Sequence, residues 1–73
     1  MPGDYNLEEI SSTEFKIVHK EGKEQYTIKV NDMGPGNVVY EGMPEQFKIF
    51  LNSYSDQDLR SMPKQVLETI LRS

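Results

Sequence analysis

The side chains best suited to acid–base chemistry in this sequence are one histidine, His19, and two closely spaced carboxylates, Asp56 and Asp58. A histidine can act as a general base near neutral pH, and paired carboxylates can exchange protons with a substrate. However, Ser55 stands directly before Asp56 and three residues before Asp58, which is the spacing of a helix N-cap. We therefore expect the two acids to cap a helix and His19 to be an ordinary residue at the end of a strand.

Other patterns lack the residues that catalysis or cofactor binding needs. Residues 34–36 (GPG) have the glycine content of a phosphate loop, but no lysine with serine or threonine and no helix start follow them. The chain has no cysteine, which excludes a thiolate metal site, and its single histidine is too few for a histidine-based one. We predict no catalytic residue, no cofactor and no metal, so an enzyme is the least favoured class.

The composition indicates one small domain with a thin core. The chain has 73 residues, and its hydrophobic content of 36% is low for a globular domain. The formal net charge is −4, and the eight lysines and arginines form no run. Because nucleic-acid binding needs clustered basic residues, we do not expect a nucleic-acid partner. A basic surface on another protein is the better electrostatic match.

The sequence also lacks membrane and export signals. No segment approaches the roughly 18–20 apolar residues of a membrane span, and residues 1–4 have neither the basic nor the apolar region of a secretory signal. The lack of cysteine fits a reducing compartment. We therefore expect a cytoplasmic protein without a membrane partner.

The first half of the chain predicts an arm followed by strands. Residues 1–12 contain a proline, a glycine and three acids, and we predict a flexible or loosely docked acidic arm there. Apolar and polar residues alternate over residues 15–20 and again over residues 25–30, with Gly22 in a turn between them. This pattern predicts an antiparallel hairpin. Residues 38–40 are short and β-rich, and predict a third strand.

The second half predicts helices. Pro44 suits the first position of a helix, where its missing N–H costs nothing. Ser55 is the expected N-cap of a short helical turn, and Pro63 is expected to begin a last helix. The helical spacing of apolar residues predicts one apolar face after Gly42 and another after Pro63. The first face consists of Met43, Phe47, Phe50, Leu51 and Tyr54, and the second of Val66, Leu67, Ile70 and Leu71.

Together these elements predict an α+β fold, with a β-hairpin or three-stranded antiparallel sheet followed by two to three short helices on one face. The expected domain spans residues 13–73. In so small a domain, apolar residues that cover the sheet in one state can bind a partner in another. The predicted partner-binding residues are Phe15, Ile17, His19, Met43, Phe47, Phe50, Leu51, Val66, Leu67 and Ile70.

Two stretches of the sequence resemble the regulatory segment of PAK-family protein kinases. Residues 42–47 (GMPEQF) are similar to the family's G-(M/L)-P-E-Q-W stretch, and residues 63–71 (PKQVLETIL) are similar to its P-Q-A-V-L-D-V-L helix. Either residues 27–30 (TIKV) or residues 17–20 (IVHK) fall at the place of the CRIB motif, which binds Rac-type GTPases. The proline and the His-x-x-His pair of that motif are missing, so the helical half resembles the family better than the GTPase-binding half.

The resemblance implies a non-catalytic regulatory module that binds a Rac-type GTPase or packs on a kinase domain. In that interpretation residues 14–20 form the edge strand that pairs with the GTPase. A second interpretation is a self-folded small domain, microbial or viral, that binds a protein through its helical face without any GTPase. A third is an assembly subunit that associates through a strand edge. The sequence leaves the oligomeric state open.

Overall fold

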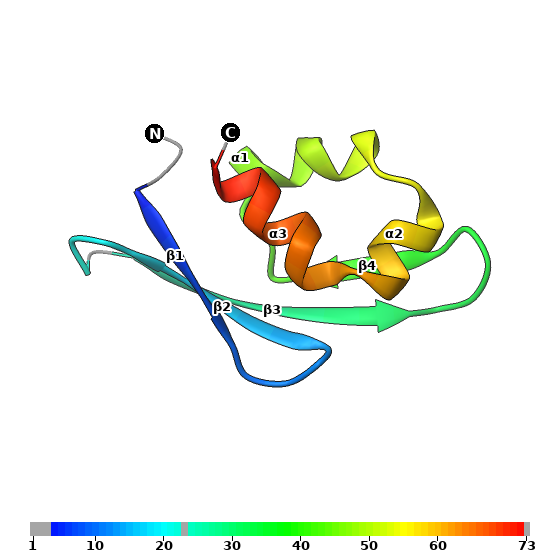
Figure 1. Ribbon diagram of the computed structural model, residues 1–73, viewed down its shortest axis with the longest axis horizontal. Coiled ribbons are helices and arrows are strands. Elements are labelled where there is room, and N and C mark those ends of the chain that lie inside the picture. Colours follow the sequence, from blue (N-terminus) through cyan, green and yellow to red (C-terminus); the bar gives the residue numbers. More distant parts are fainter. Residues whose placement is uncertain (1–3, 23, 73) are drawn as a thin grey trace.

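A four-stranded antiparallel sheet carries all of the described helices on one of its faces (Figure 1). The computed structural model describes residues 4–22 and 24–72. Neighbours in the chain are neighbours in the sheet, and the strands are β1 (Tyr5–Glu9), β2 (Glu14–His19), β3 (Gln25–Asp32) and β4 (Val38–Glu41). The predicted α+β fold is confirmed, and β2, β3 and β4 include the three strands expected from the sequence. The sheet has one strand more than predicted.

The additional strand is β1, which lies in the segment expected to be an arm. Tyr5 is paired with His19 and Leu7 with Ile17, so β1 forms one edge of the sheet. The prediction of a flexible arm over residues 1–12 is therefore wrong for residues 5–9, while residues 1–3 lie outside the described residues. Apolar and polar residues alternate over residues 5–8, and this period of two is what places them in the sheet.

The two faces of the sheet differ in polarity because successive strand residues point to opposite sides. On the face under the helices, Phe15 is paired with Ile28, and both are buried. On the open face, cross-strand partners carry opposite charges: Glu8 is paired with Lys16, and Glu14 with Lys29. Water can therefore solvate the open face, and the apolar face must be covered.

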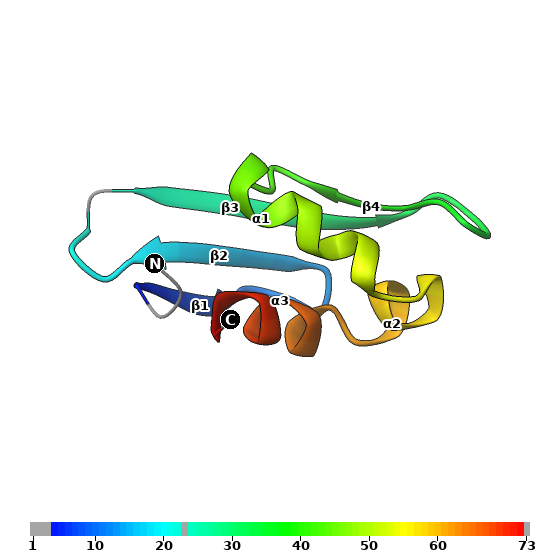
Figure 2. The same cartoon turned by 90° about the horizontal axis from the view of Figure 1, so that it is seen from above.

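The covering layer is built from α1 (Glu45–Lys48), the 3₁₀ helix η1 (Ile49–Ser53), α2 (Asp56–Ser61) and α3 (Pro63–Arg72) (Figure 2). Pro44 is extended, with φ −62° and ψ 145°, and occupies the N-cap of α1. The helix thus begins one residue later than predicted. Pro63 is the first residue of α3, and Ser55 Oγ accepts a hydrogen bond of 3.1 Å from the Asp58 N–H, both as the sequence indicates.

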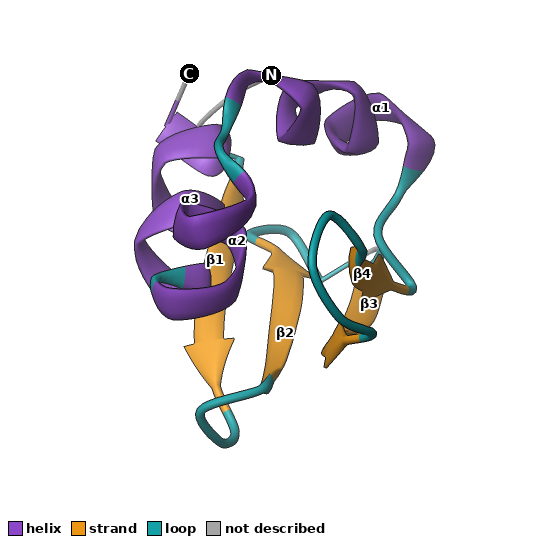
Figure 3. Cartoon of the chain, turned by 90° about the vertical axis from the view of Figure 1, so that its right-hand side faces the viewer, coloured by secondary structure: helices purple, strands orange, loops and turns teal. Residues whose placement is uncertain are grey.

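The core lies between the sheet and this helical layer (Figure 3). The Tyr40 hydroxyl from β4 is buried there and donates a hydrogen bond of 2.8 Å to the Leu59 carbonyl oxygen of α2. That burial raises the pKa of Tyr40 above the ordinary tyrosine range. The buried apolar residues are Phe15, Ile17, Ile28, Val30, Tyr40, Met43, Phe47, Val66, Leu67, Ile70 and Leu71.

The turn from β4 into the helical layer depends on Gly42. Its φ is +87°, which residues with a side chain rarely adopt. A Cβ at this position would also collide with the backbone carbonyl oxygen of Thr27 in β3. Only glycine fits this close approach, so Gly42 sets where the chain leaves the sheet for α1.

The loop between β3 and β4 is tied to α2 at one end of the sheet (Figure 1). The Arg60 guanidinium of α2 contacts Asp32 Oδ2 at 2.8 Å, Asp56 Oδ2 at 2.9 Å and the Gly34 carbonyl oxygen at 3.1 Å. Asp56 Oδ2 also accepts from the Gly36 N–H at 3.1 Å. The bond from Arg60, aided by the Gly34 N–H, holds the pKa of Asp32 below its usual range.

The first prediction concerns the core. Replacing the fully buried Leu67 by alanine should lower the free energy of unfolding by about 2–5 kcal/mol, because methyl groups are removed and a cavity remains. The matched control is Ile49→Ala on η1, which should change it by less than about 0.5 kcal/mol since Ile49 is 67% exposed. Urea unfolding measures both. Equal losses for the two variants would contradict the assigned core.

The second prediction concerns Gly42. Gly42→Ala should destabilise the chain more than Gly22→Ala does. Both positions have positive φ, but an alanine Cβ at Gly22 meets open space while one at Gly42 meets the Thr27 carbonyl. Thermal unfolding of the two variants isolates the cost of the collision. A larger loss at Gly22 would show that the turn is not built as described.

The third prediction concerns acid stability. The folded-state pKa of Asp32 is lowered, so its contribution is complete above the unfolded value of about 4 and is lost as the pH falls through the folded value. Asp32→Asn should therefore flatten the decline of stability below about pH 4. The same change in an Arg60→Ala background should have a smaller effect. Parallel pH profiles for wild type and Asp32→Asn would contradict this ion pair.

Candidate functional site

Seven of the ten predicted partner-binding residues are core residues in this structure, each no more than 8% exposed. They come from both layers and pack against one another between the sheet and the helices. The structure therefore brings them together, but as an interior that a partner reaches only if the layers separate. These residues are Phe15, Ile17, Met43, Phe47, Val66, Leu67 and Ile70.

His19 is half-buried at the end of β2 and is occupied by its neighbours. Its ring lies edge-on to that of Tyr5, with the centroids 4.9 Å apart. Its Nδ1 accepts a hydrogen bond of 3.1 Å from the Glu21 N–H in the following turn. These contacts give His19 a packing and turn-stabilising part, as expected for a residue that ends a strand.

The two acids at the start of α2 are also engaged in structural contacts. Asp58 donates its backbone N–H to the Ser55 cap, and the Asp56 carboxylate is held by Arg60 and the Gly36 N–H. The capping predicted from the sequence is thus confirmed for Ser55. Among residues 4–22 and 24–72, no group of three or more histidine, cysteine, aspartate or glutamate side chains is arranged so that it could hold a metal ion.

The accessible apolar part of the helical layer lies on η1. Ile49 is 67% exposed and Phe50 is 41% exposed, and we call these two residues the η1 patch. The next residue, Leu51, is half-buried against the core. Phe50 was predicted on the same face as Phe47, but only Phe47 is buried. The η1 patch is therefore open to a partner without any rearrangement.

A shallow apolar groove lies further along the same helical layer. It has a volume of about 130 Å³ and is bordered by Tyr54 after η1, Met62 between α2 and α3, and Val66 of α3. Met62 is 41% exposed. The helical layer therefore displays both a protruding apolar patch and a recess.

The strand expected to pair with a GTPase does not lie at an edge. β2 contains residues 14–19 and is hydrogen-bonded to β1 on one side and to β3 on the other. The prediction that residues 14–20 form an edge strand is therefore wrong for this structure. The edges of the described sheet are β1 and β4. β1, which was not predicted from the sequence, takes the outer position beside β2.

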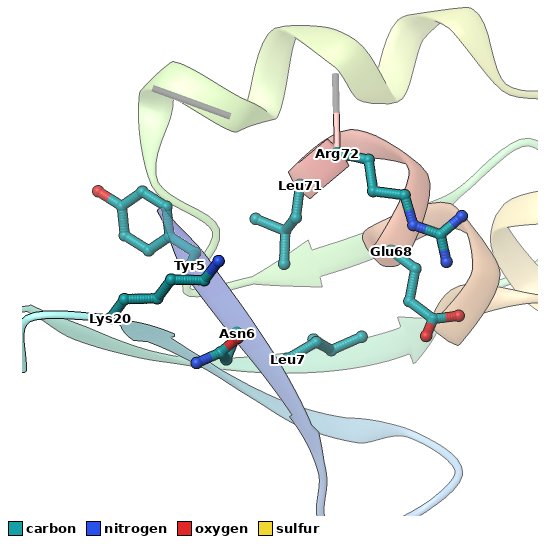
Figure 4. A pocket seen from close by; sticks show the side chains of 7 residues that line it. All are labelled: Tyr5, Asn6, Leu7, Lys20, Glu68, Leu71 and Arg72. Carbon is teal, nitrogen blue, oxygen red and sulfur yellow. The ribbon is translucent and has the colours of Figure 1, made fainter. Parts of the chain in front are cut away.

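A second groove lies along β1 (Figure 4). Its volume is about 260 Å³, and Lys20 and Arg72 place two cationic groups beside it. This groove was not predicted from the sequence, because residues 1–12 were expected to form an arm. The alternation over residues 5–8 was the available signal. The lining residues are Tyr5, Asn6, Leu7, Lys20, Glu68, Leu71 and Arg72.

Comparison with protein-family models, with curated proteins and with solved structures finds no match to this chain. None of the helices in the described part of the chain is both long and apolar enough to cross a membrane.

Proposed function

We propose that this chain is a non-catalytic regulatory module that binds a protein partner through the η1 patch. The observation that carries the proposal is the exposure of two adjacent apolar side chains, Ile49 and Phe50, on a layer whose other long apolar residues mostly face the core. Covering them with a partner removes apolar surface from water, which is the main driving force of association.

The charge of the chain supports a protein partner with a basic surface. The net charge is −4. A chain with this excess of acidic groups repels phosphate and favours a partner with a basic surface. We also propose a cytoplasmic location, which fits the absence of cysteine.

The resemblance to PAK-family regulatory segments supplies the first partners to test. The similar stretches are residues 42–47 and 63–71, which form the start of the helical layer and α3. A Rac-type GTPase bound by strand pairing would need β2 to leave its neighbours. A partner that docks on the helical layer, such as a kinase domain, needs no such change.

The fourth prediction tests the η1 patch directly. A photoreactive amino acid at Phe50 should cross-link one specific protein in cells that naturally contain the chain. The same group at Lys29, on the open face of the sheet, is the matched control and should not. Adding Ile49→Asp should abolish the adduct without lowering the free energy of unfolding by more than about 0.5 kcal/mol, because Ile49 is exposed.

Equal cross-linking from positions 50 and 29, or an adduct that survives Ile49→Asp, would overturn this proposal. The nature of the partner is decided with purified proteins. A Rac-type GTPase loaded with a GTP analogue that binds, while its GDP form does not, would establish the GTPase link. Binding of the kinase domain alone would establish the inhibitory one, and binding of neither would favour the self-folded domain without a GTPase connection.

A further inference from the structure

The outer edge of β1 has backbone groups that no described strand uses. The Lys20 N–H donates to the Asp4 carbonyl oxygen at 2.7 Å, and the Ile10 N–H donates to the Glu14 carbonyl oxygen at 3.0 Å. Antiparallel bonding alternates along a strand, so residues 4, 6, 8 and 10 direct their backbone groups toward β2. The N–H and C=O groups of Tyr5, Leu7 and Glu9 therefore point away from the sheet.

This edge is bordered by α3, which runs antiparallel to β1. Lys64 Nζ near the start of α3 lies 3.3 Å from Glu9 Oε1, while Arg72 at its end lines a groove with Tyr5. In Figure 4, Leu71 points from α3 toward β1, with Lys20 on one side of the strand and Arg72 on the other. The edge of β1 is thus the floor of a concave seam rather than a bare rim.

The two ends of this seam differ in chemistry. At the start of β1, the groove of about 260 Å³ is lined by Lys20, Arg72 and Glu68, which sum to a charge of +1 in a chain of net charge −4. At the end of β1, a groove of about 310 Å³ is lined by the apolar side chains of Phe15, Met62 and Pro63 together with the paired Glu9 and Lys64.

We propose that the β1 edge and α3 form a binding groove for an extended peptide of another protein, which adds as a fifth strand. The peptide carries a carboxylate where Lys20 and Arg72 flank the start of β1, and an apolar side chain four residues away, beside Met62 and Pro63. Tyr5 and Glu9 are four strand residues apart, or about 13 Å. Peptide residues opposite both positions direct their side chains to the helical face. This surface is independent of the η1 patch.

A second copy of the chain fits this groove less well than a foreign peptide. Antiparallel pairing of two β1 strands about Leu7 would place α3 beside its own copy. Because Lys64, Glu68 and Arg72 follow one another at four-residue intervals on that side of the helix, Lys64 would then face Arg72 and Glu68 would face Glu68. Like charges would meet at each position, which disfavours self-association.

The fifth prediction uses a designed probe, acetyl-Leu-Thr-Val-Thr-Glu-amide, titrated into the ¹⁵N-labelled chain to millimolar concentration. We expect saturable shifts at the amides of Tyr5, Leu7 and Glu9, with slower exchange because these N–H groups gain acceptors. A probe with lysine in place of its glutamate should bind at least about threefold more weakly, since an exposed ion pair is lost. A third probe, with alanine last and a free C-terminus, distinguishes a terminal from a side-chain carboxylate.

Three variants test the groove itself. Glu9→Pro removes an outward N–H at an edge position and should abolish binding, whereas Glu9→Gln keeps the N–H and should retain it. Arg72→Glu should reverse the preference between the glutamate and lysine probes. Both Glu9 variants must keep a cooperative thermal transition, and Arg72→Glu supplies the test if Glu9→Pro does not fold. No saturable shift, shifts away from β1, or a mass that doubles with concentration in place of peptide binding would overturn the proposal.

Discussion

The packing of α3 against the apolar face of the sheet holds this small domain together. Only 36% of the residues are hydrophobic, so the apolar face of the sheet cannot be covered unless nearly every apolar helix residue is used. α3 supplies Val66, Leu67, Ile70 and Leu71, each no more than 5% exposed. Without α3, Phe15, Ile17 and Ile28 would face water. The domain therefore has little apolar surface to spare. For that reason, the exposure of Ile49 and Phe50 supports the proposal that the η1 patch binds a partner.

Tyr5 adds side-chain contacts to the backbone pairing that joins β1 to β2. Its ring packs edge-on against both His19 of β2 and Phe47 of α1, with centroid distances of 4.9 and 5.2 Å. Its hydroxyl donates to Glu24 Oε2 at 3.2 Å. The 2.8 Å bond from the Tyr26 hydroxyl, and after it this bond from Tyr5, lowers the pKa of Glu24. One aromatic residue thus joins a strand edge to two other elements. This attachment fixes the floor of the seam beside α3 while leaving its outer backbone groups available.

Local signals in the sequence predicted most of the fold. The alternation in β2 and β3, the Ser55 cap and Pro63 at the start of α3 all depend on neighbouring residues, and the structure confirms them. β1 was missed because its acids and the preceding proline and glycine outweighed a short alternation. The surfaces were harder to predict, because a helical apolar face shows which residues avoid water but not what covers them. Phe47 is buried and Phe50 is exposed through tertiary packing alone.

Amide hydrogen exchange of the isolated chain shows whether β1 is the edge strand of the sheet beneath α3. The account predicts slow exchange for Asn6 and Glu8, whose N–H groups face β2, and faster exchange for Leu7 between them, whose N–H faces outward. The amides of Phe15 and Ile17 should be among the slowest. Uniformly fast exchange over residues 5–9, or equal protection of Leu7 and its two neighbours, would contradict the account.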